Sequence, residues 1–228
     1  MTNYLALSVS FFVIAIAAGI VYFAVLLYQN SRYPKTERNS LRNSYGYEFY
    51  SCEQPGTRSV LYTLLSIDTI SLCLGFFFYF LTDKAVYSYI LAAVFIISLI
   101  CICGANMIPL SHPTAHLVMA FAGMGFMGVG TLLLAFSDMI NEGLFHLVNM
   151  GIGVSVTMGI IGGITILALF NPKLRDWAKM DKTEVNGVTV YEKPRINWLA
   201  LYEWISIILC HVIGLILFVN VVVTGQIG

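Results

Sequence analysis

The sequence has little charge. Asp, Glu, Lys and Arg together make up 11% of its 228 residues, whereas hydrophobic residues make up 58%. Soluble domains carry roughly 25% charged residues. A soluble fold of this length cannot bury so much apolar surface, and a disordered chain would be far more polar. The composition therefore excludes both classes and indicates a protein of the lipid bilayer.

Several familiar motifs are also missing. The chain has no phosphate-binding glycine loop, no dinucleotide fingerprint, no HExxH and no GxSxG. It has no Asn-X-Ser/Thr glycosylation site. Its 12 basic residues are balanced by 12 acidic ones, so a nucleic acid is not an expected partner.

Cysteines and histidines are too few and too scattered to predict a cofactor or a metal. The five cysteines are Cys52, Cys73, Cys101, Cys103 and Cys210. An odd number gives no disulfide framework, and no pair has CxxC spacing. Cys52 is expected to be a free loop thiol, a lipidated thiol or a partner of Cys103. No two of the four histidines on different helices share a depth, which argues against haem.

Six long apolar runs predict the fold class: an all-α, polytopic membrane protein with a six-helix bundle as a single domain over 1–228. A spanning helix needs about 20 such residues, and nothing alternates as in a membrane barrel. The first run is too long for a signal-peptide core and lacks a basic flank and a cleavage site, so we expect a retained span. The predicted spans are 4–28, 59–82, 86–104, 114–136, 144–170 and 198–224.

The basic residues are concentrated in two long loops, 29–58 and 171–197. Five lie in the first loop and six in the second: Arg32, Lys35, Arg38, Arg42 and Arg58, then Lys173, Arg175, Lys179, Lys182, Lys193 and Arg195. Six spans place both loops on one side. The positive-inside rule predicts that this side is cytoplasmic and that both termini are outside. Within the second loop, Asn-Gly at 186–187 between β-branched residues predicts a small hairpin.

Small residues recur every fourth position in the fifth predicted span. Gly151, Ser155, Gly159 and Gly163 would form one smooth stripe on a helix, where another backbone can approach closely. We expect this stripe to pack within the bundle, most directly against the glycine-rich fourth span. A homo-oligomer interface is the alternative.

Four ionisable residues lie at membrane depth. Asp68 is in the second span, His116 begins the fourth, and Glu203 and His211 are in the sixth. From a rise of 1.5 Å per residue, Asp68 lies at about the depth of His211, and Glu203 at about that of His116. Ionisable groups in lipid are expensive and are candidates for function. Each pair is expected to be a structural hydrogen bond or, for His116 and Glu203, an acid–base pair.

Short motifs resemble the six-span family of the damage-regulated autophagy modulators, which includes GPI-anchor remodelling relatives. The matching places are Tyr50-Ser51-Cys52, Gly104-Ala105-Asn106, the stretch His116 to Gly123 and Tyr202-Glu203-Trp204. The resemblance implies a six-helix membrane protein. In that family the first loop faces the lumen or exterior, whereas the basic residues here predict the cytoplasm; we follow the charge rule.

Three functions remain open from the sequence. The first is a non-enzymatic scaffold or regulator that acts through membrane lipids, partner membrane proteins or a second copy of the chain. The second is a lipid-modifying or lipid-transporting protein that uses His116 and Glu203. The third is an accessory subunit of a larger membrane complex.

Overall fold

The computed structural model describes most of the chain. Described are residues 2–34, 38–51, 55–82, 86–109, 111–140, 151–176, 181–185, 188–192 and 194–223. Cys52 and the turn at 186–187 lie outside these ranges.

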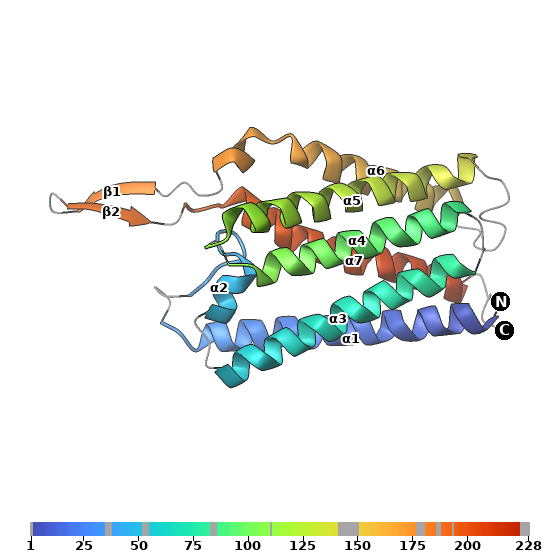
Figure 1. Cartoon of the computed structure of the whole chain (residues 1–228), viewed down its shortest axis with the longest axis horizontal. Helices are drawn as coiled ribbons and strands as arrows, with labels where there is room; N and C mark the ends of the chain where they lie inside the picture. Colours follow the sequence, from blue (N-terminus) through green and yellow to red (C-terminus); the bar gives the residue numbers. More distant parts are fainter. Residues whose placement is uncertain are drawn as a thin grey trace.

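Six long helices run side by side along the molecule (Figure 1). Their bounds are α1 Thr2–Ser31, α3 Pro55–Leu81, α4 Val86–Met107, α5 Pro113–Ile140, α6 Gly151–Leu169 and α7 Trp198–Val223. All but α6 are long and apolar enough to cross a bilayer; α6 is apolar but shorter over its described part. The chain is therefore an integral, multi-pass membrane protein.

Helix α7, the last in the chain, packs against most of the other long helices. The earlier long helices pack in chain order, α1 on α3, α3 on α4, α4 on α5 and α5 on α6, whereas α7 contacts α1, α3, α4 and α5. Aromatic side chains fill the interior, with the rings of Phe76 and Phe95 stacked at 4.8 Å and Phe12 edge-on to Phe76 at 5.3 Å. Because α7 lies against four helices, polar groups on it can reach several elements.

The extramembrane elements gather at one end of the bundle. Here lie the short helix α2 (Gly46–Ser51), the 3-10 helix η1 (Pro172–Asp176) and the strands β1 (Asp181–Val185) and β2 (Val188–Glu192). The strands pair antiparallel and project from the bundle, in agreement with the predicted hairpin, so the all-α prediction holds only for the bundle. We call this end the loop end. Helix α1 begins and α7 ends at the opposite end (Figure 1).

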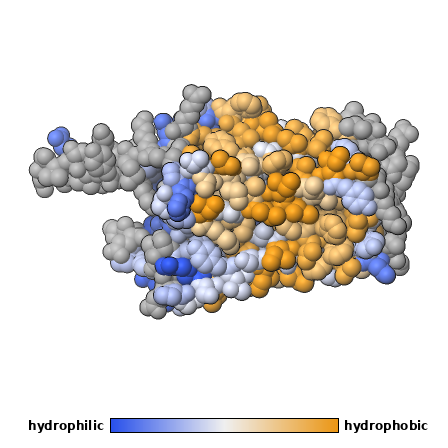
Figure 2. All heavy atoms as spheres, in the orientation of Figure 1, coloured by the Kyte–Doolittle hydropathy of each residue, from blue (hydrophilic) through white to orange (hydrophobic). Residues whose placement is uncertain are grey.

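Surface hydropathy matches this arrangement. Apolar side chains cover the middle of the bundle, and hydrophilic ones gather over the loop end, around α2 (Figure 2). The described parts of the two long loops therefore lie at the same end of the bundle.

Helices α5 and α6 meet through glycines, and their closest approach lies beside the predicted stripe. A Cβ added at Gly162 would lie 2.9 Å from the backbone nitrogen of Leu132, and one at Gly128 would lie 3.3 Å from that of Ile166. By contrast, a Cβ at Gly159 would lie 3.6 Å from Ala135, and one at Gly163 would meet nothing within 4 Å. The closest approach is thus one residue away from the stripe.

The remaining stripe positions are at the margin of this contact or not described. The side chain of Ser155 is half-buried, and the surroundings of Gly151 lie outside the described part of the structure. A four-residue spacing predicts that one face of the helix is smooth. It does not say whether Gly162 or its neighbour Gly163 lies closer to the next helix.

Candidate functional site

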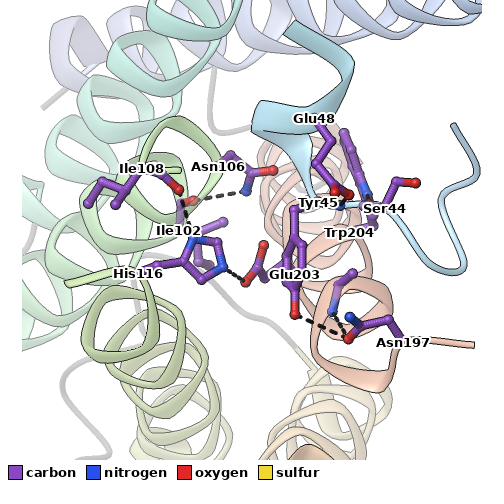
Figure 3. A network of polar contacts seen from close by, with 11 residues as sticks. Ser44, Tyr45, Glu48, Ile102, Asn106, Ile108, His116, Asn197, Glu203 and Trp204 are labelled. Atoms are coloured by element: carbon purple, nitrogen blue, oxygen red, sulfur yellow. Dashed lines mark hydrogen bonds and ion pairs between the residues drawn. The ribbon is translucent and has the colours of Figure 1, made fainter. Parts of the chain in front are cut away.

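A histidine and a carboxylate meet at the loop end of the bundle. His116, in the first turn of α5, places its Nε2 atom 2.9 Å from Oε1 of Glu203 on α7. The Nδ1 atom of the same ring lies 2.9 Å from the carbonyl oxygen of Ile108. Since a carbonyl oxygen only accepts, Nδ1 carries a hydrogen, and Nε2 is the atom that faces Glu203 (Figure 3).

The first long loop closes over this pair. The ring of Tyr45 lies edge-on to His116 at 4.9 Å, and that of Tyr47 lies edge-on at 6.1 Å. The side chains of His116 and Glu203 are 0% and 2% exposed. Among the described residues, both side chains of the pair are therefore buried beneath these rings.

Direct hydrogen bonds fasten the loop to α7. The Nε1–H group of Trp204 donates to the carbonyl oxygen of Ser44 at 2.9 Å, and the hydroxyl of Tyr45 donates to Oδ1 of Asn197 at 3.2 Å. The backbone N–H of Asn197 donates to the carbonyl of Arg42 at 2.8 Å. We call residues 38–51, held in this way, the loop cap.

Electrostatics favour a neutral Tyr45. Burial, helped by the nearby Glu203 carboxylate, raises the pKa of the Tyr45 hydroxyl well above its ordinary value of 10.0. The hydroxyl thus keeps its hydrogen and remains the donor to Asn197. The backbone N–H of Tyr45 in turn donates to Oε2 of Glu48 at 2.8 Å.

The loop cap also rests on α1 and α4. The hydroxyls of Tyr50 in α2 and Tyr22 in α1 are hydrogen-bonded to each other. Asn106 on α4 donates to the carbonyl of Ile102 at 2.9 Å, and its Oδ1 lies so close to Gly46 that a Cβ there would clash with it. Only glycine fits at position 46 without displacing Asn106.

A second pair of the same kind lies midway along the bundle. Nε2 of His211 on α7 is 2.8 Å from Oδ1 of Asp68 on α3, and Nδ1 is 2.8 Å from the carbonyl of Ile207. The Asp68 side chain is 3% exposed and the His211 side chain 18%. Both pairs considered from the sequence are thus brought together by the structure.

Helix α1 leaves room for this central pair. A Cβ at Gly19 would lie 2.6 Å from Nε2 of His211 and 3.5 Å from Oδ1 of Asp68. On the other side, a cavity of about 10 Å³, close to the volume that one water needs, is lined by Asp68, His211, Thr69, Cys103 and Cys210.

The thiols around the central pair do not form a metal site. The described cysteines are all free, which removes the considered bridge from Cys103 to Cys52. Among the described residues no three His, Cys, Asp or Glu side chains are arranged to hold a metal ion.

Sequence reasoning located the four ionisable residues but missed their surroundings. Tyr45 and Asn197 lie in loops and Trp204 lies in the second turn of α7, and in neither place does a sequence show the partner of a side chain. No repeated spacing of small residues marks Gly19 in the sequence, since it is a single glycine in an apolar helix. An Asn, a Trp and a Tyr near the membrane boundary were the available hint, because such side chains need hydrogen-bond partners when buried.

Comparison with known proteins adds no family: no family model, curated protein or solved structure matches the chain.

Proposed function

We propose that the chain is a non-enzymatic integral membrane scaffold or regulator, acting through lipids and partner proteins at its loop end. The observation that carries this proposal is the sealing of the His116–Glu203 pair, with side chains 0% and 2% exposed under the rings of Tyr45 and Tyr47. A catalytic acid–base pair must reach its substrate. A pair sealed in this way acts instead as a fastening between α5, α7 and the loop cap.

The hairpin supports a role in partner binding. Strands β1 and β2 project from the loop end, beyond the bundle (Figure 1). A two-stranded hairpin is only marginally stable in isolation, and its outer edges offer unpaired backbone groups. A rigid cap with a projecting hairpin suits a protein that docks a partner outside the membrane.

The proposed topology has six crossings. They are the five helices long enough to span, together with α6, which is the fifth crossing in chain order. Both basic loops are cytoplasmic, with the termini outside. In support, α1 begins and α7 ends at the end opposite to the loops (Figure 1). Relationship to the damage-regulated autophagy modulators and their GPI-anchor remodelling relatives remains a proposal that rests on the short motifs alone.

One observation favours the alternative of lipid chemistry. Nε2 of His116 and Oε1 of Glu203 are 2.9 Å apart, within the reach that general acid–base catalysis requires. This function needs the loop cap to open toward the membrane surface. The third proposal is that the chain is an accessory subunit of a larger complex. The experiment that tests the scaffold proposal tests this one as well.

The experiment is quantitative co-purification from native membranes. The complete chain is compared with a variant in which residues 181–192 are replaced by a Gly/Ser linker, and with a control variant, Glu184→Gln, that alters one exposed charge. A scaffold retains a stoichiometric partner in the control and loses it without the hairpin. Isolation of the chain without any stoichiometric protein, in mild detergent and in native nanodiscs alike, contradicts both the scaffold and the subunit proposals.

A further inference from the structure

A small cavity lies inside the bundle, beside the central pair of Asp68 and His211. It has a volume of about 10 Å³ and is bounded by α3, α4 and α7. Most of its wall is leucine and isoleucine, but Asp68, Thr69, Cys103 and Cys210 line it as well. A water molecule needs roughly 10–15 Å³ of such space. The cavity therefore has room for one water and for nothing larger.

Asp68 has an unused hydrogen-bond acceptor at this cavity. Its Oδ1 atom lies 2.8 Å from Nε2 of His211. Among the residues that the structure describes, none donates a hydrogen bond to its Oδ2 atom. A carboxylate has two oxygens and can accept about four hydrogen bonds. Because the Asp68 side chain is 3% exposed, bulk solvent does not supply the missing donor.

The depth of Asp68 in the membrane makes an unpaired oxygen costly. Asp68 is near the middle of α3, which spans Pro55–Leu81. At 1.5 Å per residue it lies about 20 Å from either end of the helix, near the middle of a hydrocarbon core about 30 Å thick. Lipid tails offer no hydrogen-bond donor, and a buried polar group without a partner is strongly unfavourable. The donor must therefore come from inside the bundle.

The polar groups of the cavity wall suit a water and not a metal ion. The hydroxyl of Thr69 can both donate and accept, and thiols do so weakly. A buried water needs two to four such partners. Among the described residues, no three His, Cys, Asp or Glu side chains are arranged to hold a metal ion. The loop end differs, because Oε2 of Glu203 also has no hydrogen-bond partner but is fully enclosed. The cavity beside Asp68 combines an unpaired acceptor with the space for a donor.

We propose that this cavity binds one water molecule, which donates a hydrogen to Oδ2 of Asp68 and is held on its other side by the hydroxyl of Thr69. His211 then holds one oxygen of the carboxylate and the water holds the other. The polar requirement of Asp68 is thus met from both sides within the bundle. The thiols of Cys103 and Cys210 add weak polar contacts. The site does not involve the loop cap, so its failure would leave the scaffold proposal untouched.

The direct test is a crystal structure of the complete chain grown from a lipidic mesophase, at a resolution that shows ordered waters. We expect a single density peak in the cavity, about 2.8 Å from Oδ2 of Asp68, the usual distance for a hydrogen bond between two oxygens. A cavity without density beside a well-ordered Asp68 would overturn the proposal. A peak at the distances of about 2.0–2.6 Å that bound Mg²⁺ and Ca²⁺ keep from oxygen would overturn it as well.

Filling the cavity is the second test, and the sign of its effect separates a hydrated cavity from a dry one. Cys103→Val enlarges a side chain of the wall. Expulsion of a water would leave Asp68 short of a donor, so the unfolding temperature of the detergent-solubilised protein should fall by a few degrees. Filling a dry cavity would raise that temperature instead.

Two further variants control for the change at Cys103. Cys103→Ser keeps a small polar side chain and should retain the density peak. Cys101→Val alters another half-buried thiol of α4 that does not line the cavity, and it should change the unfolding temperature little. An unfolding temperature of Cys103→Val equal to or above that of the wild type, or equal losses in Cys103→Val and Cys101→Val, would contradict the proposal.

Discussion

Glu203 and His211 lie eight residues apart on α7, and each is paired with a different helix. Glu203 contacts His116 of α5 at 2.9 Å, whereas His211 contacts Asp68 of α3 at 2.8 Å. Eight residues correspond to a rise of about 12 Å. The last helix of the chain is thus fastened at two depths by the same chemistry, and its position depends on buried polar contacts as well as on packing.

Removing the Glu203 carboxylate should strongly destabilise the bundle. In Glu203→Ala the sealed His116 ring loses its partner, and breaking a buried pair typically costs about 3–5 kcal/mol. We expect a clear drop in the unfolding temperature of the detergent-solubilised protein, measured by dye fluorescence. Glu184→Ala, at an exposed hairpin position, is the control and should change little.

A double-mutant cycle separates pairing from packing. If the Glu203 carboxylate stabilises the protein through its contact with the His116 imidazole, the two losses in the free energy of unfolding are not additive. His116→Gln combined with Glu203→Gln should then lower that free energy by clearly less than the sum of the two single changes. Additive effects would mean that the contact contributes nothing beyond the volume of its side chains.

The sequence predicted the helices well because their signals are local. Apolar runs placed α3, α4, α5 and α7 to within a few residues, and depth counting paired Asp68 with His211 and Glu203 with His116. The loop cap was not predictable, since Trp204–Ser44 and Tyr45–Asn197 join positions far apart in the chain. On α6 the small-residue pattern did not predict that the closest approach to α5 is at Gly162, because such a pattern identifies a possible contact without its partner.

The central pair depends on a missing side chain. Gly19→Ala places a Cβ 2.6 Å from Nε2 of His211, so the imidazole must move away from Asp68. We expect a loss of roughly 1–3 kcal/mol, as for other overpacked sites, seen as a lower unfolding temperature. Gly56→Ala, where a Cβ meets nothing within 4 Å, should leave that temperature unchanged or higher. Equal behaviour of the two variants would show that the pair tolerates displacement.

Adjacent glycines on α6 should respond differently to the same change. Gly162→Leu drives a large side chain into the backbone of α5, where a Cβ alone would be 2.9 Å from the Leu132 nitrogen. Gly163→Leu points into open space in the structure. We expect limited proteolysis to release α6 faster in the first variant only. Greater damage from Gly163→Leu would indicate that the predicted stripe packs against another molecule in the membrane.

The two long loops should show the same accessibility from each side of the membrane. A Cys52→Ser background carrying Glu184→Cys reports on the hairpin, and the native Cys52, which lies outside the described residues, reports on the first loop. By the positive-inside rule, an impermeant maleimide should label neither in intact cells and both after permeabilisation. Labelling of both in intact cells would reverse the orientation, and labelling of only one would contradict an even number of crossings.

The loop cap should weaken at high pH. Burial raises the pKa of Tyr45 above its ordinary value of 10.0, so above that pH the unfolded chain loses a proton that the folded chain retains. The free energy of unfolding therefore falls as the pH rises beyond about 10 and is unaffected by this group at lower pH. Tyr45→Phe removes the titrating hydroxyl together with its bond to Asn197, a net loss of about 1 kcal/mol at neutral pH. Unfolding temperatures measured between pH 8 and pH 11 should thus start lower for Tyr45→Phe than for the wild type but decline less steeply as the pH rises. Parallel curves for the two proteins would show that Tyr45 is not the group responsible for the decline.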